Sequence, residues 1–523
     1  MTKKQNFDTL QTMPNKLYSI AKLGMSTRTV ELETDVTSGL HVFSIVGLPD
    51  KAVEESKERI SSALKNNGFK PPRAFNKRVI INLAPADIKK EGGLYDLGMA
   101  LGFLIDSQQI EPVFDLSKTL VVGEVGLNGI IRSVRGVILY AIHGAENGFE
   151  NIIVPAGNKQ EAELIKDINV IAPDNIGELV AFLEKRGEIK DKKPIGKKAA
   201  SVKTQHDFSL IQGQENAKCA LEVAVAGGHN ILFHGPPGSG KSMLAKTATT
   251  IMPTLSYEEA LEVTKIESVC GNVSTQNPLA ENRPFRSPHH ASSESAIIGG
   301  GSTLNPGEIT RAHRGILFLD EFPEFHRDIL ESLRQPMENG SITVARAKGT
   351  VNYPSKFMLI AAANPCPCGY FGDPKRECNC TTASVIKYQR KLSGPIADRI
   401  DMHISVPRQH FKKISSEDLA ESSQSIRKRV EKARFIQQNR FKNDPIHTNS
   451  EMGIKEIKKY CAIDANLKNF IGLAIEKYKL SARAYHSILK VARTVADLAN
   501  SESIQRPHIA QTLQYIKRDM EII

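Results

Sequence analysis

The spacing of apolar residues in the first part of the chain is typical of a mixed domain. Up to about residue 188, short apolar runs alternate with stretches of helical periodicity. The strand-like runs include Leu40–Leu48, Arg78–Ala86 and Thr119–Leu127. Because strands and helices are mixed along this region, we expect residues 1–188 to form an α/β or α+β domain.

The pattern changes after this region. Residues 189–206 are rich in lysine, poor in large apolar residues and contain Pro194, which is typical of an exposed linker. Strands alternate with helices again over residues 207–410, and three of these apolar strands end in a chemically useful polar group. Over residues 411–523 the apolar positions follow helical spacing, for example in Gln424–Phe441. The chain is therefore predicted to be an α/β multidomain protein with a helical C-terminal region.

Composition adds an expected location and a class of partner. The 523 residues are enough for about three domains of typical size. No apolar run approaches the roughly twenty residues of a membrane span, and the polar start lacks the apolar core of a signal peptide. We therefore expect a cytoplasmic protein with no membrane partner. The net charge of +11 suits a polyanion such as nucleic acid, although a generally basic proteome would give the same excess.

The strongest signal for chemistry is a glycine-rich loop. Ile231–Phe233 is an apolar run that predicts a buried strand, and the residues after it fit the pattern G-x-x-x-x-G-K-S. In such a loop backbone N–H groups point at phosphate oxygens, the lysine reaches the β- and γ-phosphates, and the serine hydroxyl binds Mg²⁺. The next helix directs its positive N-terminal dipole at the phosphates. The predicted ATP and Mg²⁺ site consists of Gly235, Pro236, Pro237, Gly238, Ser239, Gly240, Lys241 and Ser242.

Two further strands end in groups that complete such a site. The apolar strand Gly315–Phe322 ends in Asp320, a predicted Mg²⁺ ligand, and in Glu321, which would orient and deprotonate the attacking water. Another apolar strand ends in Asn364, whose amide could hold that water and sense the γ-phosphate. Alone, this asparagine could equally cap a turn, so its predicted role depends on the other two strands.

Together these motifs resemble those of the AAA+ superfamily of ATPases. Four longer strings extend the comparison: Arg283–Gly301, Pro306–Phe325, Asn364–Asp373 and Ser393–Ile404. These strings are similar to the magnesium-chelatase-like ATPases of the ComM/YifB family, and the resemblance covers essentially the whole chain. It implies a P-loop core with a parallel sheet over residues 207–410 and a helical lid over residues 411–523.

The resemblance also implies roles for two arginines outside the phosphate loop. Arg399 matches the family's arginine finger, which one subunit donates to the ATP of its neighbour. Arg483 matches the second sensor arginine of the lid. Each could instead be a surface or ion-paired arginine. Both roles imply a homo-oligomeric ring, expected to be a hexamer, because a finger used between subunits has no target in a monomer.

Two elements could touch DNA. Residues 341–355 predict a β-hairpin with Arg346 and Lys348 near its tip. Hairpins at this place line the central pore in related AAA+ helicases, where two cations would grip phosphates without reading sequence. The hairpin could equally be an edge that carries solubilising charges. His289 and His290 could act near DNA, between subunits, or only within the fold, and the sequence leaves these alternatives open.

A cysteine cluster follows the strand that ends in Asn364. It consists of two C-x-C pairs, and four thiolates this close in sequence could surround a tetrahedral structural Zn²⁺. The alternative is four reduced thiols in a loop. The remaining three of the seven cysteines are isolated and are expected to be structural. The candidate Zn²⁺ ligands are Cys366, Cys368, Cys378 and Cys380.

The N-terminal region resembles the proteolytic domain of Lon, a fold shared with an S5-like ribosomal domain and with part of the branch-migration ATPase RadA. Lon uses a Ser-Lys dyad, but the aligned positions are Leu94 and Ile138, which supply neither a nucleophile nor a base. We therefore expect a binding or ring-stabilising platform. Lys89 and Lys90 could meet DNA there, although a solvated pair is the simpler interpretation. The resemblance lies in residues 74–104 and 123–158.

The predicted function is that of an ATP-driven ring that acts on DNA. Resemblance to the ComM/YifB family implies a helicase that drives branch migration of DNA joints during natural transformation. One alternative is a chelatase-type ATPase that remodels a protein partner, although the chain has no obvious acidic or metal-adhesion domain. Another is a non-enzymatic scaffold, which the intact Lys241, Asp320 and Glu321 argue against.

Overall fold

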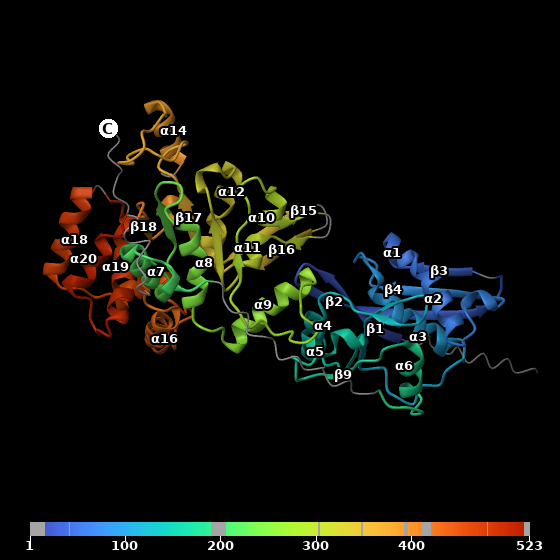
Figure 1. The fold of residues 1–523 in the computed structure, drawn as a ribbon. Coiled ribbons are helices and arrows are strands. Elements are labelled where there is room, and N and C mark those ends of the chain that lie inside the picture. Colours follow the sequence, from blue (N-terminus) through green and yellow to red (C-terminus); the bar gives the residue numbers. More distant parts are fainter. Residues whose placement is uncertain are drawn as a thin grey trace, which may run out of the picture. The chain divides into compact units, whose positions relative to one another are not determined.

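The chain folds into two compact units (Figure 1). The first consists of residues 1–198 and 264–280, and the second of residues 199–263 and 281–523. The predicted linker falls almost entirely outside the described residues. The computed structural model describes residues 16–40, 42–189, 206–301, 304–346, 349–391, 396–409, 420–478 and 480–516.

The first unit is built on a mixed seven-stranded sheet with the order β3-β4-β2-β1-β5-β8-β9. β1, β2 and β4 are antiparallel neighbours, whereas β3 runs parallel to β4, and β1, β5, β8 and β9 run parallel to one another. Apolar residues of α2, α3 and α6 share one core with the sheet. The bounds are β1 (Lys16–Leu23), β2 (Ser26–Ser38), β3 (Val42–Val46), β4 (Lys77–Ala84), β5 (Thr119–Val121), β8 (Asn151–Ile153), β9 (Asn169–Ile171), α2 (Ser56–Asn66), α3 (Asp96–Asp106), α4 (Val137–Glu146) and α6 (Ile176–Leu183).

Two positions of this unit bear on the expected resemblance to Lon. Leu94 lies in a short turn before α3 and packs against the hydrophobic core, and Ile138 is fully buried in α4. Both side chains are apolar and serve packing, so neither position can carry a protease dyad. The assignment of this unit to a Lon-like fold stays a prediction.

One of the two lysines expected in solvent is buried. Lys89 is exposed, but the side chain of Lys90 is enclosed and its ammonium donates to the carbonyl of Pro85. Burial lowers the pKa of Lys90 because water is removed from the charged form. The expectation of a solvated pair is therefore wrong for Lys90.

The second unit is built on a five-stranded sheet with the order β11-β14-β17-β10-β18, and every neighbouring pair runs parallel. Phe233 of β10 lies opposite Ala362 of β17 on one side and Ile404 of β18 on the other. The bounds are β10 (Ile231–His234), β11 (Phe285–Arg286), β14 (Ile316–Leu319), β17 (Met358–Ala363) and β18 (Met402–Ser405).

This strand order places the functional ends of three strands together. The chain leaves β10 toward β11, β14 and β17 on one side and returns to β18 on the other. The strand order therefore reverses beside β10, and in parallel sheets ligands bind at the carboxyl ends next to such a reversal. The phosphate loop follows β10, Asp320 follows β14 and Asn364 follows β17, so the three groups predicted at strand ends lie at this edge of the sheet.

The core of the second unit also includes C-terminal helices. All residues of β14 and β17 are buried, which is typical of a parallel sheet covered on both faces. Their cluster includes residues of α7 (Glu215–Gly227) and α8 (Lys241–Ile251), together with Val430 of α16 (Ser423–Arg440) and Val491 of α19 (Ala482–Leu498). A second cluster joins α17 (Ile454–Tyr460), α18 (Ala465–Tyr478), α19 and α20 (Arg506–Leu513). The predicted α/β fold with a parallel sheet and a helical C-terminal region is confirmed.

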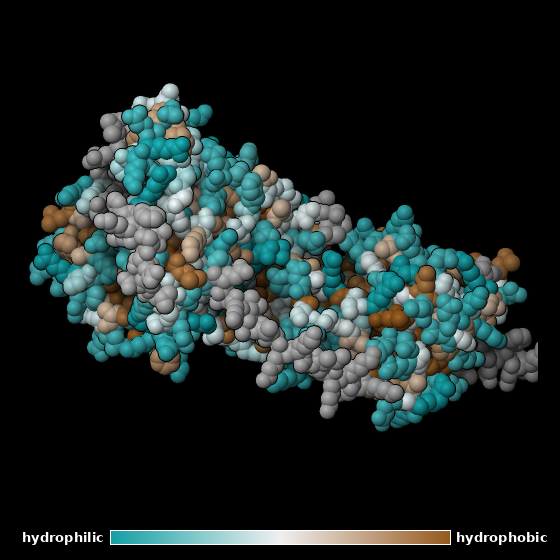
Figure 2. Space-filling view, in the orientation of Figure 1, coloured by the Kyte–Doolittle hydropathy of each residue, from teal (hydrophilic) through white to brown (hydrophobic). Residues whose placement is uncertain are grey.

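The visible surface is mostly polar. On the face shown in Figure 2, hydrophilic side chains predominate and hydrophobic ones lie in small groups between them. Within the described residues, no helix is both long enough and apolar enough to cross a membrane.

Candidate nucleotide-binding site

The phosphate loop connects β10 to α8 and requires its glycines. A Cβ atom on Gly235 would lie 2.2 Å from the carbonyl oxygen of Val406, so only glycine fits between the loop and the segment after β18. Gly238 and Gly240 have φ angles of +72° and +94°, in the left-handed region that favours glycine. No atom lies within 4 Å of a Cβ built on either residue, so that side of the loop is open.

The loop is also supported from α7. Gln214 precedes this helix, and its side-chain amide donates to the carbonyls of Ser239 at 3.1 Å and Pro407 at 2.7 Å. The sequence did not single out this glutamine, because nothing in the local pattern indicates that it reaches the phosphate loop.

Lys241 joins the phosphate loop to the end of β17. Its buried ammonium donates to the carbonyls of Gly235 at 2.7 Å and Pro236 at 3.0 Å, and to Oδ1 of Asn364 at 3.1 Å. Burial lowers the pKa of Lys241, and the negative charge of Asp320 opposes that shift. An anionic ligand beside Lys241 would therefore favour the charged ammonium.

Two oxygen groups stand together at the start of α8. The hydroxyl of Ser242 on α8 donates to Oδ2 of Asp320 at 2.7 Å, which brings together the predicted Mg²⁺ ligands from the start of α8 and from the residue after β14. Hydroxyl and carboxylate oxygens are hard ligands of the kind Mg²⁺ prefers, beside phosphate oxygens and water. The buried hydroxyl of Ser239 has no hydrogen-bond partner among the described residues. These donors and oxygens fit the triphosphate of a nucleotide with Mg²⁺.

Glu321 has a partner that the sequence did not assign. Oε2 of Glu321 lies 3.0 Å from Nδ1 of His290, and the Glu321 backbone has a φ of +51°. The ring of His290 lies 4.2 Å from that of His289 and meets Phe325 edge-on at 6.4 Å. The pairing of β11 with β14 brings the segment after β11 to the end of β14. The sequence left the role of His290 open, and the structure adds a specific possibility, which is contact with the predicted catalytic carboxylate.

The predicted arginine finger and the predicted second sensor arginine meet at one carboxylate. Nε of Arg399 donates to Oε1 of Glu338 at 2.8 Å, and Arg483 donates to the same oxygen at 3.1 Å. Glu338 lies on α13 (Arg334–Asn339), and hydrogen bonds from Arg483 and Arg399 lower its pKa. The sequence did not identify Glu338, because its two partners come from distant parts of the chain.

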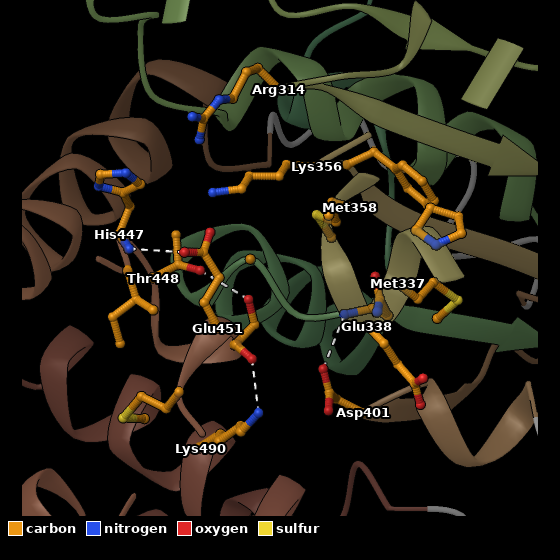
Figure 3. A pocket seen from close by; sticks show the side chains of 18 of the residues that line it. Arg314, Met337, Glu338, Lys356, Met358, Asp401, His447, Thr448, Glu451 and Lys490 are labelled. Carbon is orange, nitrogen blue, oxygen red and sulfur yellow. Dashed lines mark hydrogen bonds between the residues drawn. The ribbon is translucent and has the colours of Figure 1, made fainter. Parts of the chain in front are cut away.

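Both arginines line a cavity of about 1030 Å³ in the second unit. Figure 3 shows this cavity, with Glu338, Asp401 and Lys490 among the labelled side chains that line it. None of the residues 235–242 lies among the described residues of its lining. The two arginines therefore lie together in a cavity that the phosphate loop of the same chain does not line.

The four clustered cysteines converge after β17. Their Sγ atoms all lie within 4.8 Å of one another, and all four thiols are free. Such a group could hold a metal ion. The cysteines are Cys366, Cys368, Cys378 and Cys380.

The predicted hairpin is present, and its tip lies in part outside the described residues. β15 (Ser341–Arg346) pairs antiparallel with β16 (Gly349–Pro354), with Arg346 opposite Gly349. Arg346 is exposed, whereas Lys348 lies outside the described residues. The hairpin therefore presents at least one cation near its turn.

Comparisons with known proteins cover nearly all of the chain. Family models match over residues 32–158 (subunit ChlI of Mg-chelatase), 207–414 (magnesium chelatase, subunit ChlI) and 420–516 (magnesium chelatase, subunit ChlI C-terminal). The 38 kDa subunit of magnesium chelatase from Rhodobacter capsulatus is 22% identical over 333 residues, which cover 60% of this chain and 87% of that protein.

Two relatives match over almost their entire length. Competence protein ComM of Haemophilus influenzae is 40% identical over 508 residues, which cover 95% of this chain and 96% of the relative. The uncharacterised protein YifB of Escherichia coli is 38% identical over 512 residues, which cover 97% of this chain and 98% of the relative. With these identities and the motifs of its nucleotide site, the chain belongs to the ComM/YifB family of magnesium-chelatase-like AAA+ proteins.

Proposed function

We propose that this protein hydrolyses ATP in a homo-oligomeric ring, expected to be a hexamer, and uses the energy to move branched DNA during natural transformation. The observation that carries the ATPase part is the convergence of Lys241, Ser242 and Asp320 with Asn364 at one edge of the sheet. The AAA+ family itself indicates ATPase activity. The DNA part is supported by the competence-protein relative, the net charge of +11 and the exposed cation of the hairpin.

Each residue at this edge has a part in hydrolysis. The N–H groups of the phosphate loop and the Lys241 ammonium would bind phosphate oxygens, and Ser242 and Asp320 would hold Mg²⁺. When bound, Mg²⁺ would neutralise charge on the phosphates. Asn364 holds the attacking water, and a carboxylate oxygen of Glu321 accepts its proton. His290 keeps the Glu321 carboxylate directed into the site.

The remaining charge stabilisation comes from the neighbouring subunit. Arg399 and Arg483 lie together at Glu338 and line a cavity without the phosphate loop. In a ring, this pair would face the ATP of the next subunit, where guanidinium groups stabilise charge on the γ-phosphate. Glu338 positions both arginines before the neighbouring subunit binds its nucleotide.

A chelatase-type motor that acts on a protein partner is the second candidate. It is favoured by the three matching family models, which all describe a magnesium chelatase subunit. Its nucleotide chemistry would be the same, so the substrate of the motor distinguishes the two.

Substitution Glu321→Gln removes the proton acceptor and keeps the shape of the side chain. We expect ATP to bind normally and the turnover rate to fall by about 10²–10⁴-fold. Forked DNA should raise the wild-type ATPase rate and leave the variant inactive, as measured by phosphate release with and without DNA. A Glu321-dependent rate that DNA does not change would support the protein-remodelling motor instead.

Substitution Arg399→Ala should abolish hydrolysis in a neighbour, whereas Lys241→Ala should abolish it in the same subunit. Co-expressed in equal amounts, the two variants should recover up to about a quarter of the wild-type rate. Random mixing places an intact Lys241 opposite an intact Arg399 at about one interface in four. ATPase rates of purified mixed rings measure this. Failure of every mixing ratio to exceed the separate variants would contradict action between subunits.

Substitution Arg346→Ala should weaken binding to single-stranded DNA of any sequence. If Arg346 neutralises one phosphate, the slope of log K against log salt should fall by about 0.7. Fluorescence anisotropy over a salt series measures this slope. Arg427→Ala, which removes an arginine paired with Glu431 on α16, is the matched control. Equal slopes for the wild type and Arg346→Ala would exclude a phosphate contact.

Substitution His290→Ala should release the carboxylate of Glu321. We expect the turnover rate to fall by about tenfold with little change in KM for ATP, since a group that orients a catalytic residue acts mainly on the chemical step. His290→Gln, which can still donate a hydrogen bond, should recover part of the rate. His326→Ala, at an exposed histidine paired with Asp328, should behave as wild type. A changed KM with an unchanged turnover rate would argue against this role.

A further inference from the structure

The loop between β17 and α14 (Thr382–Lys391) holds a cluster that nucleotide hydrolysis does not use. It begins directly after Asn364 and brings two C-x-C pairs face to face. Sγ of Cys366 lies 3.3 Å from that of Cys368 and 3.6 Å from that of Cys378, and the latter two lie 3.5 Å apart. Cys366 is fully buried and the other three cysteines are half-buried.

These separations match a single tetrahedral metal ion. Zn²⁺ with four Zn–S bonds of about 2.3 Å keeps neighbouring sulfurs about 3.8 Å apart. Three of the sulfurs lie 3.3–3.6 Å apart, close to that spacing, and all four lie within 4.8 Å of one another. An iron–sulfur cluster with several irons between its ligands would require the sulfurs to stand further apart.

The backbone of the loop donates hydrogen bonds to two of the four sulfurs. The N–H groups of Gly369 and Phe371 donate to Sγ of Cys366 at 3.2 and 3.3 Å, and the N–H of Cys368 donates to Sγ of Cys380 at 3.4 Å. Hydrogen bonds of this kind orient the ligands of a metal ion.

We propose that Cys366, Cys368, Cys378 and Cys380 bind one structural Zn²⁺ as four thiolates. Each thiol gives up its proton to solvent as it binds, and zinc stays divalent throughout. With four protein ligands the coordination is complete, so the ion has no open position for substrate and serves the fold alone.

The proposed ion would hold the Asn364 end of β17 against the phosphate loop. A Cβ atom on Gly369, which has a φ of +86°, would lie 2.6 Å from the ring of Pro237, so the cysteine loop packs directly on the phosphate loop. On the other side, the amide of Gln389 donates to the carbonyl of Pro365 at 3.2 Å. This second step rests on the proposed function, because it assigns Asn364 a part in ATP hydrolysis.

The first test is the metal content of the full-length purified protein. Inductively coupled plasma mass spectrometry should find about one zinc per chain and no stoichiometric iron. The double variant Cys378→Ser/Cys380→Ser should retain less than about a tenth of that zinc, because two of four ligands are lost. Cys219→Ser, at an exposed thiol elsewhere, should keep the full amount. Protein without zinc, protein with iron in its place, or a double variant that keeps its zinc would overturn the proposal.

Cobalt and ATPase measurements separate the two steps. Co²⁺ exchanged into the wild type should give the intense thiolate-to-metal absorption of a tetrahedral S₄ site, and the double variant should not show it. If the ion supports Asn364, the folded double variant should bind ATP normally and turn it over at least about tenfold more slowly. If the wild type holds zinc and the double variant loses it without any change in ATPase rate, the metal site stands and its link to Asn364 is rejected. If the wild type holds no zinc and the double variant still loses ATPase activity, the metal site is rejected and the proposed ATPase function is not.

Discussion

The buried ammonium of Lys241 is the interaction on which the nucleotide site depends. It donates to two carbonyls of the phosphate loop and to the amide oxygen of Asn364, so one charge joins the ends of β10 and β17. A buried ammonium is unfavourable unless its donors are satisfied, and here the three acceptors satisfy it. All three acceptors are neutral, so the positive charge of the ammonium remains available to phosphate oxygens. Strand order supports this contact, because β10 and β17 are adjacent and parallel and therefore end at the same edge of the sheet.

The same edge of the sheet recruits groups from outside the motif. His290 reaches Glu321 because the short strand β11 pairs with β14, and Gln214 reaches the phosphate loop from the start of α7. The cysteine loop packs on Pro237 directly beyond Asn364. Each contact fixes a backbone segment before ATP binds. A site that is preorganised in this way spends less free energy on ordering these segments during the reaction.

Arg399 and Arg483 follow a different logic. They approach Glu338 from a turn before β18 and from α19, and their shared carboxylate is held ionised by both guanidinium groups. Two cations at one acceptor repel each other, so the pair is poised to accept a second anion. That property suits a site completed by a neighbouring subunit, which is the arrangement proposed for the ring.

The sequence by itself determined the chemistry of the phosphate loop, the order of its three polar strand ends and the α/β class. These follow from local rules, since glycine conformation, strand periodicity and the position of a carboxylate after an apolar run are properties of neighbouring residues. It did not reveal the burial of Lys90, the contact of His290 with Glu321, or the meeting of Arg399 and Arg483 at Glu338. Only the tertiary structure decided these, because each depends on which strands pair and which distant segments pack together. Such contacts join residues with no fixed spacing along the chain, and no local pattern records them.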